Sequence, residues 1–221
     1  MRREGSLETF SDGKLYEKDD SVKADCLECM GCSDCCHGMG NSVQLDPLDV
    51  HRLKKKLSTD FEGLLQAGKI ELTLADSFIL PSLKTSEKKD SCVFLNEYGR
   101  CSIHDARPGI CRLFPLGRYY HDRSFSYFLQ IYECSMKERR EVKVCDWIDT
   151  PEFDTYEEFV GNWHYLLKDL EGWISKNGEE NRNQMATTIL QFFYATEYGE
   201  TTFYEEYVLK EEKFRKAFGI L

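Results

Sequence analysis

The sequence predicts an α+β fold in which an irregular cysteine-rich core, built from short strands and a hairpin, is followed by a helical C-terminal cap. Five cysteines lie within residues 26–36, and four more are spread from residue 92 to 134 among short apolar runs and turn residues. From about residue 150, cysteines are absent and apolar residues recur at helical spacing. We therefore expect three parts, which are an N-terminal arm at 1–24, a cysteine-cluster domain at 25–149 and the helical cap at 150–221.

Composition limits the classes of function that the chain can have. Its 221 residues are 41% hydrophobic and 13% aromatic, which is enough for a packed core that does not depend on a bound group. The net charge of −10 and the pI near 5.1 argue against nucleic acid or an anionic membrane as a partner. No signal-peptide pattern opens the sequence, so we expect a cytoplasmic protein whose thiols are kept reduced.

The N-terminal elements are short. The polar arm is expected to contain a turn of structure around Leu7–Phe10, and residues 42–45 are expected to form a short strand. Asp46 and Pro47 predict a helix start, because Asp caps a helix N-terminus and Pro fits the first helical position. The apolar pattern carries that helix to Leu57.

Further short elements follow this helix. A second helix is expected to be capped by Ser58 or Thr59 and to end at Gly68. Two strands are then expected, at 70–74 and 78–80. The densest basic run of the chain is Lys54–Lys56, and a solvated helix face explains it better than a phosphate site.

The second half of the chain predicts a hairpin and three helices. Residues 116–120 and 125–131 flank a turn, which indicates a hairpin that brings Cys134 back toward the other cysteines. The apolar spacing predicts helices at about 156–174, 182–198 and 203–218. Their aromatic stripes indicate core packing more than a binding groove.

The run CLECMGCSDCC, at Cys26–Cys36, has the pattern of a metal site. Read from Cys26 it is C-x2-C-x2-C-x3-C, the spacing with which bacterial ferredoxins hold iron–sulfur clusters, and read from Cys29 it is C-x2-C-x2-C-C. The two-residue gaps let successive thiolates turn inward around one metal. The alternative of buried or disulfide-paired cysteines is disfavoured, because thiols this close have few disulfide geometries open to them.

Nine cysteines lie within the first 134 residues, and two four-thiolate sites would use eight of them. We therefore hypothesise two iron–sulfur sites, or one cluster plus a second metal, with the early run supplying part of each. The candidate ligands are Cys26, Cys29, Cys32, Cys35, Cys36, Cys92, Cys101, Cys111 and Cys134. Cys145 is expected to be a free thiol. For His37 two interpretations stay open: it is an alternative ligand or a proton donor beside the site, or it has only a packing or solvent role.

The cysteines lie in a longer motif, and through it the chain resembles the YkgJ-type cysteine-cluster family, which is described as zinc- or iron-chelating. The family has a C-x2-C-x2-CC run followed by a motif close to C-x-F-L…G-R-C-S-I-x-x-x-R-P-x-x-C-R-x-F-P. The chain matches this pattern at Cys29, Cys32, Cys35, Cys36, Cys92, Phe94, Leu95, Gly99, Arg100, Cys101, Ser102, Ile103, Arg107, Pro108, Cys111, Arg112, Phe114 and Pro115. Cys26 extends the usual run by one thiol.

The resemblance implies a bound metal and little about activity. A known relative, flagellin lysine N-methylase, shares the cysteine motif and is thought to carry an iron–sulfur cluster, although its length and other regions differ. The resemblance therefore favours iron–sulfur over zinc and suggests, more weakly, methyl transfer to protein lysines.

Three arginines flank the later thiols, at Arg107, Arg112 and Arg118. Thiolate-bound metals carry net negative charge, so guanidinium groups nearby would offset it and tune the site through hydrogen bonds. Surface salt bridges are the alternative. No phosphate-binding loop, dinucleotide fingerprint, Ser-His-Asp arrangement or methyl-donor motif is evident, so no catalytic residue is assigned.

Together these features favour a protein that binds one or two 4Fe-4S clusters and acts in electron transfer or cluster-dependent chemistry. Its partner would be a redox protein or another protein, with no nucleic acid and no membrane involved. Two alternatives stay open, a protein-lysine methyltransferase-like enzyme and a structural interaction module that binds zinc in place of a cluster. The sequence does not decide whether the chain is an enzyme.

Overall fold

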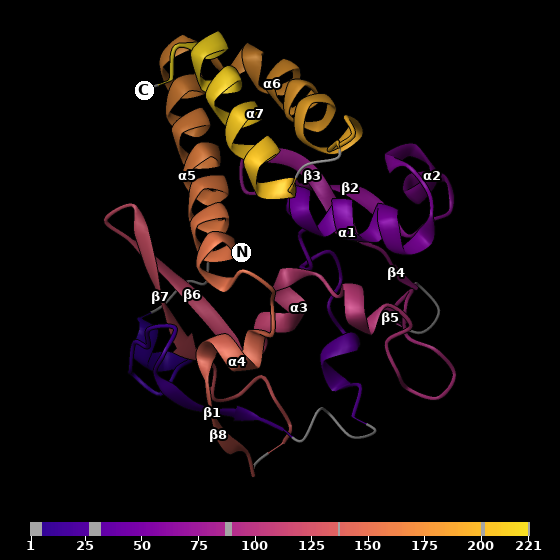
Figure 1. Cartoon of the computed structure of the whole chain (residues 1–221), viewed down its shortest axis with the longest axis vertical. Coiled ribbons are helices and arrows are strands. Elements are labelled where there is room, and N and C mark those ends of the chain that lie inside the picture. Colours follow the sequence, from indigo (N-terminus) through magenta and orange to yellow (C-terminus); the bar gives the residue numbers. More distant parts are fainter. Residues whose placement is uncertain (1–5, 27–31, 87–89, 137, 200–201, 221) are drawn as a thin grey trace. The chain divides into compact units, whose positions relative to one another are not determined.

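The fold is α+β, with helices and small antiparallel strand pairs (Figure 1). A computed structural model describes residues 6–26, 32–86, 90–136, 138–199 and 202–220. Backbone contacts group the chain into two compact units. The cysteine unit comprises Met1–Val43 and Leu83–Phe153, and the helical unit comprises Gln44–Ser82 and Asp154–Leu221. The division into arm, cysteine-cluster domain and cap stays a prediction.

The cysteine unit contains two longer antiparallel strand pairs. β1 (Ser21–Asp25) pairs antiparallel with β8 (Arg140–Lys143), and β6 (Leu116–His121) pairs antiparallel with β7 (Ser124–Leu129). The second pair is the hairpin that the sequence predicts. Its tight turn has positive φ at the two central residues, 47° and 60°, as the right-handed twist of a two-residue hairpin requires.

The N-terminal residues are hydrogen-bonded to this hairpin. The short helix η1 (Leu7–Thr9) confirms the expected turn of structure. Further along, the amide of Tyr16 donates to the carbonyl of Tyr127, and the Tyr127 amide donates back, both at 2.8 Å. The segment that precedes β1 therefore extends the β6–β7 pair by two isolated bridges, Ser11–Gln130 and Tyr16–Tyr127.

Smaller elements complete the cysteine unit and carry five of its ten cysteines. They are η3 (Asp34–Cys36), β4 (Thr85–Ser86), β5 (Ser91–Cys92), η4 (His104–Ala106), α3 (Gly109–Leu113) and α4 (Val144–Ile148). Each is five residues or shorter, so neighbouring segments rather than long hydrogen-bond ladders hold them in place.

The helical unit begins with two capped helices. In α1 (Pro47–Leu57), the Asp46 side chain accepts from the Asp49 amide at 2.8 Å, and the Asp49 side chain accepts in return from the Asp46 amide. This capping box confirms the predicted helix start. The predicted cap of α2 (Phe61–Gln66) is wrong, because Asp60 caps it and Ser58 instead ends α1 with φ of 51°.

The next segment forms the strand pair β2 (Ile70–Ala75) and β3 (Phe78–Leu83), as predicted, with Pro81 inside β3. The expected strand at 42–45 is reduced to an isolated bridge between Gln44 and Ser82. Two backbone hydrogen bonds flank this bridge, from the Leu45 amide to the Pro81 carbonyl and from the Leu83 amide to the Val43 carbonyl, both at 2.9 Å.

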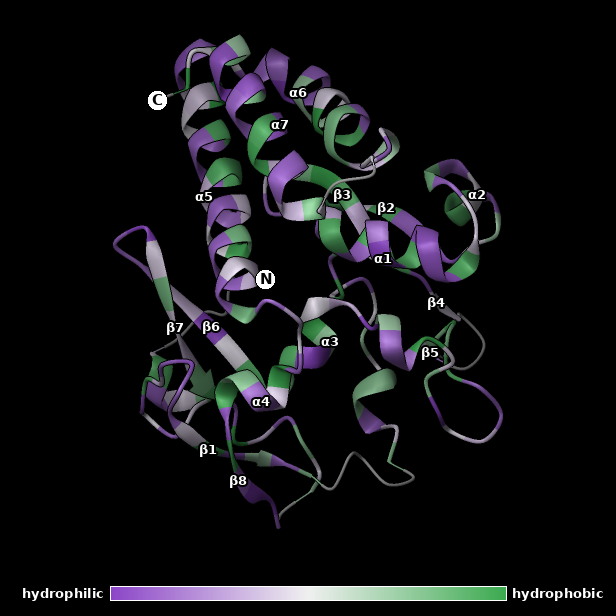
Figure 2. Ribbon diagram, in the orientation of Figure 1, coloured by the Kyte–Doolittle hydropathy of each residue, from purple (hydrophilic) through white to green (hydrophobic). Residues whose placement is uncertain are grey.

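Three long helical segments supply the core of the helical unit. The first is α5 (Phe153–Asn177). The second is α6 (Arg182–Ile189), which is preceded by the short helix η5 (Glu179–Asn181) and followed by a π-helical turn at Leu190–Ala195. The third is α7 (Phe203–Phe218). Hydrophobic and hydrophilic residues alternate around α5 and α7 (Figure 2). No helix in the described ranges is long and apolar enough to cross a bilayer.

The aromatic side chains of these helices pack against one another, as the sequence predicts. The Trp163 ring meets the rings of Phe193, Tyr194 and Tyr207 edge-on, with centroids 5.4, 5.8 and 6.5 Å away. Edge-to-face contacts of this kind are the favoured geometry for aromatic pairs. The Tyr194 hydroxyl is also satisfied, because it donates to the Leu45 carbonyl at 2.9 Å.

Candidate metal centre

The adjacent cysteines Cys35 and Cys36 are brought beside Cys92 by backbone pairing. They end η3, and the next residue, His37, forms an antiparallel bridge with Ser91. The Gly38 amide then donates to the Asp90 carbonyl at 2.9 Å, with Gly38 at φ of 66°, a conformation that favours glycine. The backbone role of His37 therefore joins η3 to β5.

A tight turn returns Cys101 toward Cys92. The Asn96 side chain accepts from the amides of Tyr98 and Arg100 at 3.0 and 2.9 Å, and Gly99 has a φ of 70°. It is an Asx-type turn, in which the side chain replaces a backbone acceptor. It places Cys101 opposite Leu95 in an isolated bridge.

The first thiol group consists of Cys35, Cys36, Cys92 and Cys101. The neighbouring thiol of Cys36 raises the pKa of Cys35, and burial raises it further. Burial raises the pKa of Cys92, and the negative charges of Cys101 and Cys35 raise it further. The Cys101 pKa is likewise raised by burial and by the charge of Cys35. These mutual effects agree with the bridges His37–Ser91 and Leu95–Cys101, which bring the three segments together.

The second thiol group consists of Cys26, Cys32 and Cys134. Burial raises the pKa of Cys134, and the negative charges of Cys26 and Cys32 raise it further. Pairing of β1 with β8 explains the approach, since Cys26 follows β1 directly and lies buried. The expected return of Cys134 toward the early cysteines is therefore confirmed. Cys29, also a candidate ligand, lies outside the described residues.

These groups hold thiols near one another without assembling a finished coordination shell. Among the described residues, no three His, Cys, Asp or Glu side chains converge closely enough to hold a metal ion. All nine described cysteines are free of disulfide bonds. Closure on a metal therefore requires side-chain rotation, and cysteine has a single χ angle to change. An all-sulfur donor set suits zinc or iron and disfavours magnesium or calcium.

The flanking arginines differ in what they contact. Arg107 faces the first thiol group, where its charge favours the thiolate and opposes the rise in the pKa of Cys35 and Cys101. Buried Arg112 instead donates to three backbone carbonyls, those of Asp105, Asp149 and Arg107, at 2.6, 2.7 and 3.2 Å. Its role is to fix the backbone beside the thiols. This differs from both sequence interpretations of Arg112, which were a charge that offsets the metal site and a surface salt bridge.

Arg118 contacts an aromatic ring. Its guanidinium lies over the Phe125 ring, 5.5 Å from the centroid, within the β6–β7 hairpin. The arginine that faces the second thiol group is Arg139, whose charge opposes the rise in the pKa of Cys134. Arg139 lies outside the recognised motif, so no sequence pattern singled it out, although it follows Cys134 closely in the chain.

Two further cysteines lie on short helices. Cys111 is on α3, one residue before Arg112, and its role as a ligand stays a prediction. Cys145 is on α4, where its thiol is 3.8 Å from a carboxylate oxygen of Asp146. Burial and the Asp146 charge raise the pKa of Cys145. The expectation of a free thiol there is consistent with this acidic neighbour.

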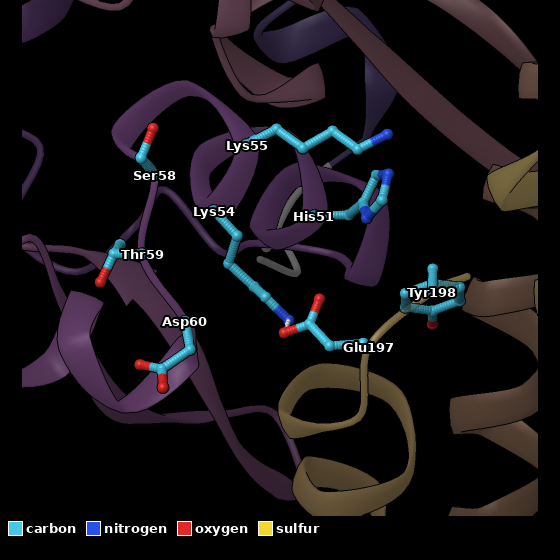
Figure 3. Close-up of a pocket in the computed structure, with 8 residues that line it drawn as sticks. All are labelled: His51, Lys54, Lys55, Ser58, Thr59, Asp60, Glu197 and Tyr198. Atoms are coloured by element: carbon cyan, nitrogen blue, oxygen red, sulfur yellow. Dashed lines mark ion pairs between the residues drawn. The ribbon is translucent and has the colours of Figure 1, made fainter. Parts of the chain in front are cut away.

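The helical unit contains a polar cavity of about 560 Å³. It is lined by His51, Lys54, Lys55, Ser58, Thr59, Asp60, Glu197 and Tyr198 (Figure 3). Lys54 is only 5% exposed, and its Nζ lies 2.6 Å from a carboxylate oxygen of Glu197. The solvated face predicted for Lys54–Lys56 is therefore wrong at Lys54, which lies one helical turn after buried Val50 and so on the same face.

His51 lies on that same face of α1. Its imidazole packs against the rings of Tyr198 and Phe203, with centroids 5.5 and 5.3 Å away. Burial lowers the pKa of His51 to about 4, helped by the positive charges of Lys55 and Lys54. Glu197 neutralises Lys54, and the lining also contains Asp60 as well as Lys55. Positive and negative side chains are therefore equal in number, and the cavity is not a strong anion site.

One comparison with known proteins returned a match. A family model named CxxCxxCC, described as a "putative zinc- or iron-chelating domain", matches residues 28–147, more than half of the chain. No curated protein and no solved structure matches. The similarity to flagellin lysine N-methylase therefore stays a prediction.

Proposed function

Because this chain belongs to the CxxCxxCC family of zinc- or iron-chelating domains and carries a metal-binding cysteine cluster, we propose that it is an iron–sulfur protein with two centres. The first would be held by Cys35, Cys36, Cys92 and Cys101. The second would be held by Cys26, Cys32 and Cys134, with Cys29 as the fourth ligand. Iron–sulfur clusters accept and release single electrons, and we propose electron transfer to a protein partner or cluster-dependent chemistry as the function.

The observation that carries this proposal is the separation of the described thiols into two groups. Each group combines part of the early run with cysteines from distant segments, which the electrostatic coupling of their thiols supports. A single cubane or a single zinc needs only four thiolates. Seven described cysteines in two groups are better explained by two centres than by one.

Two features support iron–sulfur and electron transfer. The spacing from Cys26 to Cys36 matches the ferredoxin run, in which cysteines of one run serve two clusters. Cys35 is exposed, so a cluster bound there would lie near the surface, within reach of a redox partner. Zinc bound by the same thiolates remains the alternative occupant.

The test is the iron, zinc and acid-labile sulfide content of full-length protein purified without oxygen, together with its visible spectrum. We expect about eight irons and about eight sulfides per chain, because each cubane contains four of each. Zinc without sulfide, persisting after anaerobic reconstitution with iron and sulfide, would contradict the iron–sulfur proposal. About four of each would contradict the second centre.

A further inference from the structure

The strand β2 has an open edge in the helical unit. Its neighbour β3 is paired on both sides, because it forms a sheet with β2 and is also bridged to Gln44 through Ser82. In the described part of the chain, no strand or isolated bridge pairs with the other edge of β2. Such an edge presents a row of backbone N–H and C=O groups with which another chain can pair.

The backbone groups of Leu72 and Leu74 face this open edge. Only two residues connect β2 to β3, so Leu72 lies across from Pro81. The Pro81 carbonyl accepts from the Leu45 amide at 2.9 Å, on the side of β3 away from β2. Residues that lie opposite each other in an antiparallel pair direct their backbone groups either toward each other or both outward. Those of Leu72 are therefore directed outward, and those of Leu74 follow because the direction alternates along a strand.

The same two residues expose large apolar side chains. Leu74 is 68% exposed and Leu72 is 42% exposed, and Ile79, across the two-residue turn from Leu74, is 40% exposed. These three side chains share one face of the strand pair, whereas Phe78 and Leu80 on the other face are buried. An apolar face therefore lies beside the open edge. The strand also contains neither proline nor lysine, two residues that commonly block edge pairing.

The strand is suited to pair with a second copy of itself. Two-fold symmetry would place β2 antiparallel to β2, and two registers pair both leucines within the strand. In one register Leu72 lies opposite Leu72 and Leu74 lies opposite Ile70. In the other, Leu72 lies opposite Leu74. Both registers place apolar residues opposite one another on the same face, so the apolar faces of the two sheets become continuous.

Charge also favours a second copy as the partner. The charged residue within β2 is Glu71, and in these registers it lies opposite Thr73 or Ala75, so like charges do not meet. Lys69 directly precedes the strand and Asp76 directly follows it. Antiparallel pairing brings the basic end of each strand to the acidic end of the other, so the strand ends are complementary.

We propose that the chain forms a two-fold symmetric dimer through antiparallel pairing of β2 with β2 of a second copy. The two strand pairs then form one continuous sheet, in which the β2 strands are no longer edges. The edge of a six-residue strand is small beside a standard interface of about 1,600 Å², so we expect weak association that depends on concentration. The dimer does not depend on which metal the cysteine unit binds.

The experiment is sedimentation equilibrium of full-length protein, purified without oxygen and kept reduced so that disulfides cannot link the chains. Concentrations from about 1 µM to about 1 mM cover the range of weak complexes. We expect the mass to rise from 25.8 kDa toward twice that value. A variant with both Leu72→Lys and Leu74→Lys should raise the dissociation constant by about tenfold or more, because like charges then meet across the edge.

A second double variant, with Leu72→Glu and Leu74→Glu, makes the test specific to this edge. Alone it should associate as weakly as the lysine variant. An equal mixture of the two variants should associate again, because lysine then meets glutamate in either register. The control is Leu209→Lys on α7, which places the same charge at a leucine that is 55% exposed and should leave dimerisation unchanged. Far-UV circular dichroism identifies any variant that fails to fold.

Three results would overturn the proposal. Wild-type protein that stays monomeric over the whole range would show that the edge is left open or is covered by something other than a second copy. A dimer that is equally strong in both double variants would use another surface. A mixture of the folded lysine and glutamate variants that stays monomeric would exclude direct contact between the two β2 strands.

Discussion

At the scale of single residues, several side chains have contacts that the sequence could not reveal. Glycine at position 117 is one example. It lies opposite Phe128 in the β6–β7 pair, and a Cβ built on Gly117 would come within 2.2 Å of the Phe128 ring. The glycine is therefore required by a close approach and not by its backbone angle.

Gly117→Ala should lower the free energy of unfolding by about 1–3 kcal/mol, the usual effect of overpacking a filled site. Gly172→Ala is the control, because a Cβ there meets nothing within 4 Å on the exposed side of α5. We expect it to raise the free energy of unfolding by about 0.5–1 kcal/mol. Urea unfolding of the two variants checks both values, and equal stability of the two would contradict the packing argument.

His51 gives a pH dependence at the same scale. Burial lowers its pKa from 6.5 to about 4, so the folded chain binds fewer protons than the unfolded chain between these values. The stability that neutral His51 contributes is present above pH 6.5 and is lost as the pH falls toward 4. We expect a loss on the order of 1 kcal/mol between pH 7 and pH 5, after solvent screening.

The measurement is urea unfolding of wild type and of His51→Phe at both pH values. Phe keeps the contacts with the neighbouring aromatic rings and cannot titrate. The variant should therefore lose less stability on acidification than wild type. His164, whose pKa burial also lowers to about 4, stays intact in both proteins and contributes equally. Identical losses in the two proteins would exclude His51 as a source of the acid sensitivity.

At the scale of elements, the sequence predicted best where a local signal has a single physical meaning. Asp46 and Pro47 mark the start of α1, and the turn residues near Asp122 mark the β6–β7 hairpin. The cap of α2 was misplaced because Ser58, Thr59 and Asp60 are all plausible caps in the sequence. The structure decides among them, because Ser58 ends α1 in the left-handed conformation and the Asp60 side chain accepts from the Gly63 amide at 2.7 Å.

The π-helical turn at Leu190–Ala195 was not predicted, because one extra residue per turn leaves the apolar spacing almost unchanged. Residues 42–45 show the converse. A strand was expected there, but a strand also needs a partner of matching length, and here pairing with β3 is limited to an isolated bridge.

The capping box of α1 supports a prediction at this scale. Asp46→Ala removes the acceptor for the Asp49 amide and should lower the free energy of unfolding by about 1 kcal/mol. Asp46→Asn keeps a side-chain oxygen at the cap and should retain most of the stability. Chemical denaturation at neutral pH distinguishes the variants, and similar losses for Ala and Asn would show that charge, not capping, is responsible.

At the scale of the whole molecule, the sequence identified the cysteines but not how they group. Spacing shows which thiols are neighbours along the chain, whereas the grouping depends on which distant segments meet. Cys36 approaches Cys92 because the residue after it pairs with Ser91, and Cys134 approaches Cys26 because β1 pairs with β8. Neither pairing has a local signal, since both join segments more than fifty residues apart.

All ten cysteines lie outside the ranges 44–82 and 154–221, so the aromatic core of the helical unit forms without any thiol. Loss of metal should therefore affect the cysteine unit and leave the helical unit folded. This independence makes cysteine substitutions informative, because a variant that loses one centre still has a folded reference within the same chain.

The most direct test of two independent centres is the metal and sulfide content of Cys92→Ser, of Cys134→Ser and of the double variant, each purified without oxygen. Cys145→Ser is the control, because that thiol lies beside Asp146 and belongs to neither group. We expect each single variant to keep about half of the wild-type metal, the double variant almost none, and the control all of it. If either single substitution removed all of the metal, the thiols would form one shared centre, and the account of two centres would be wrong.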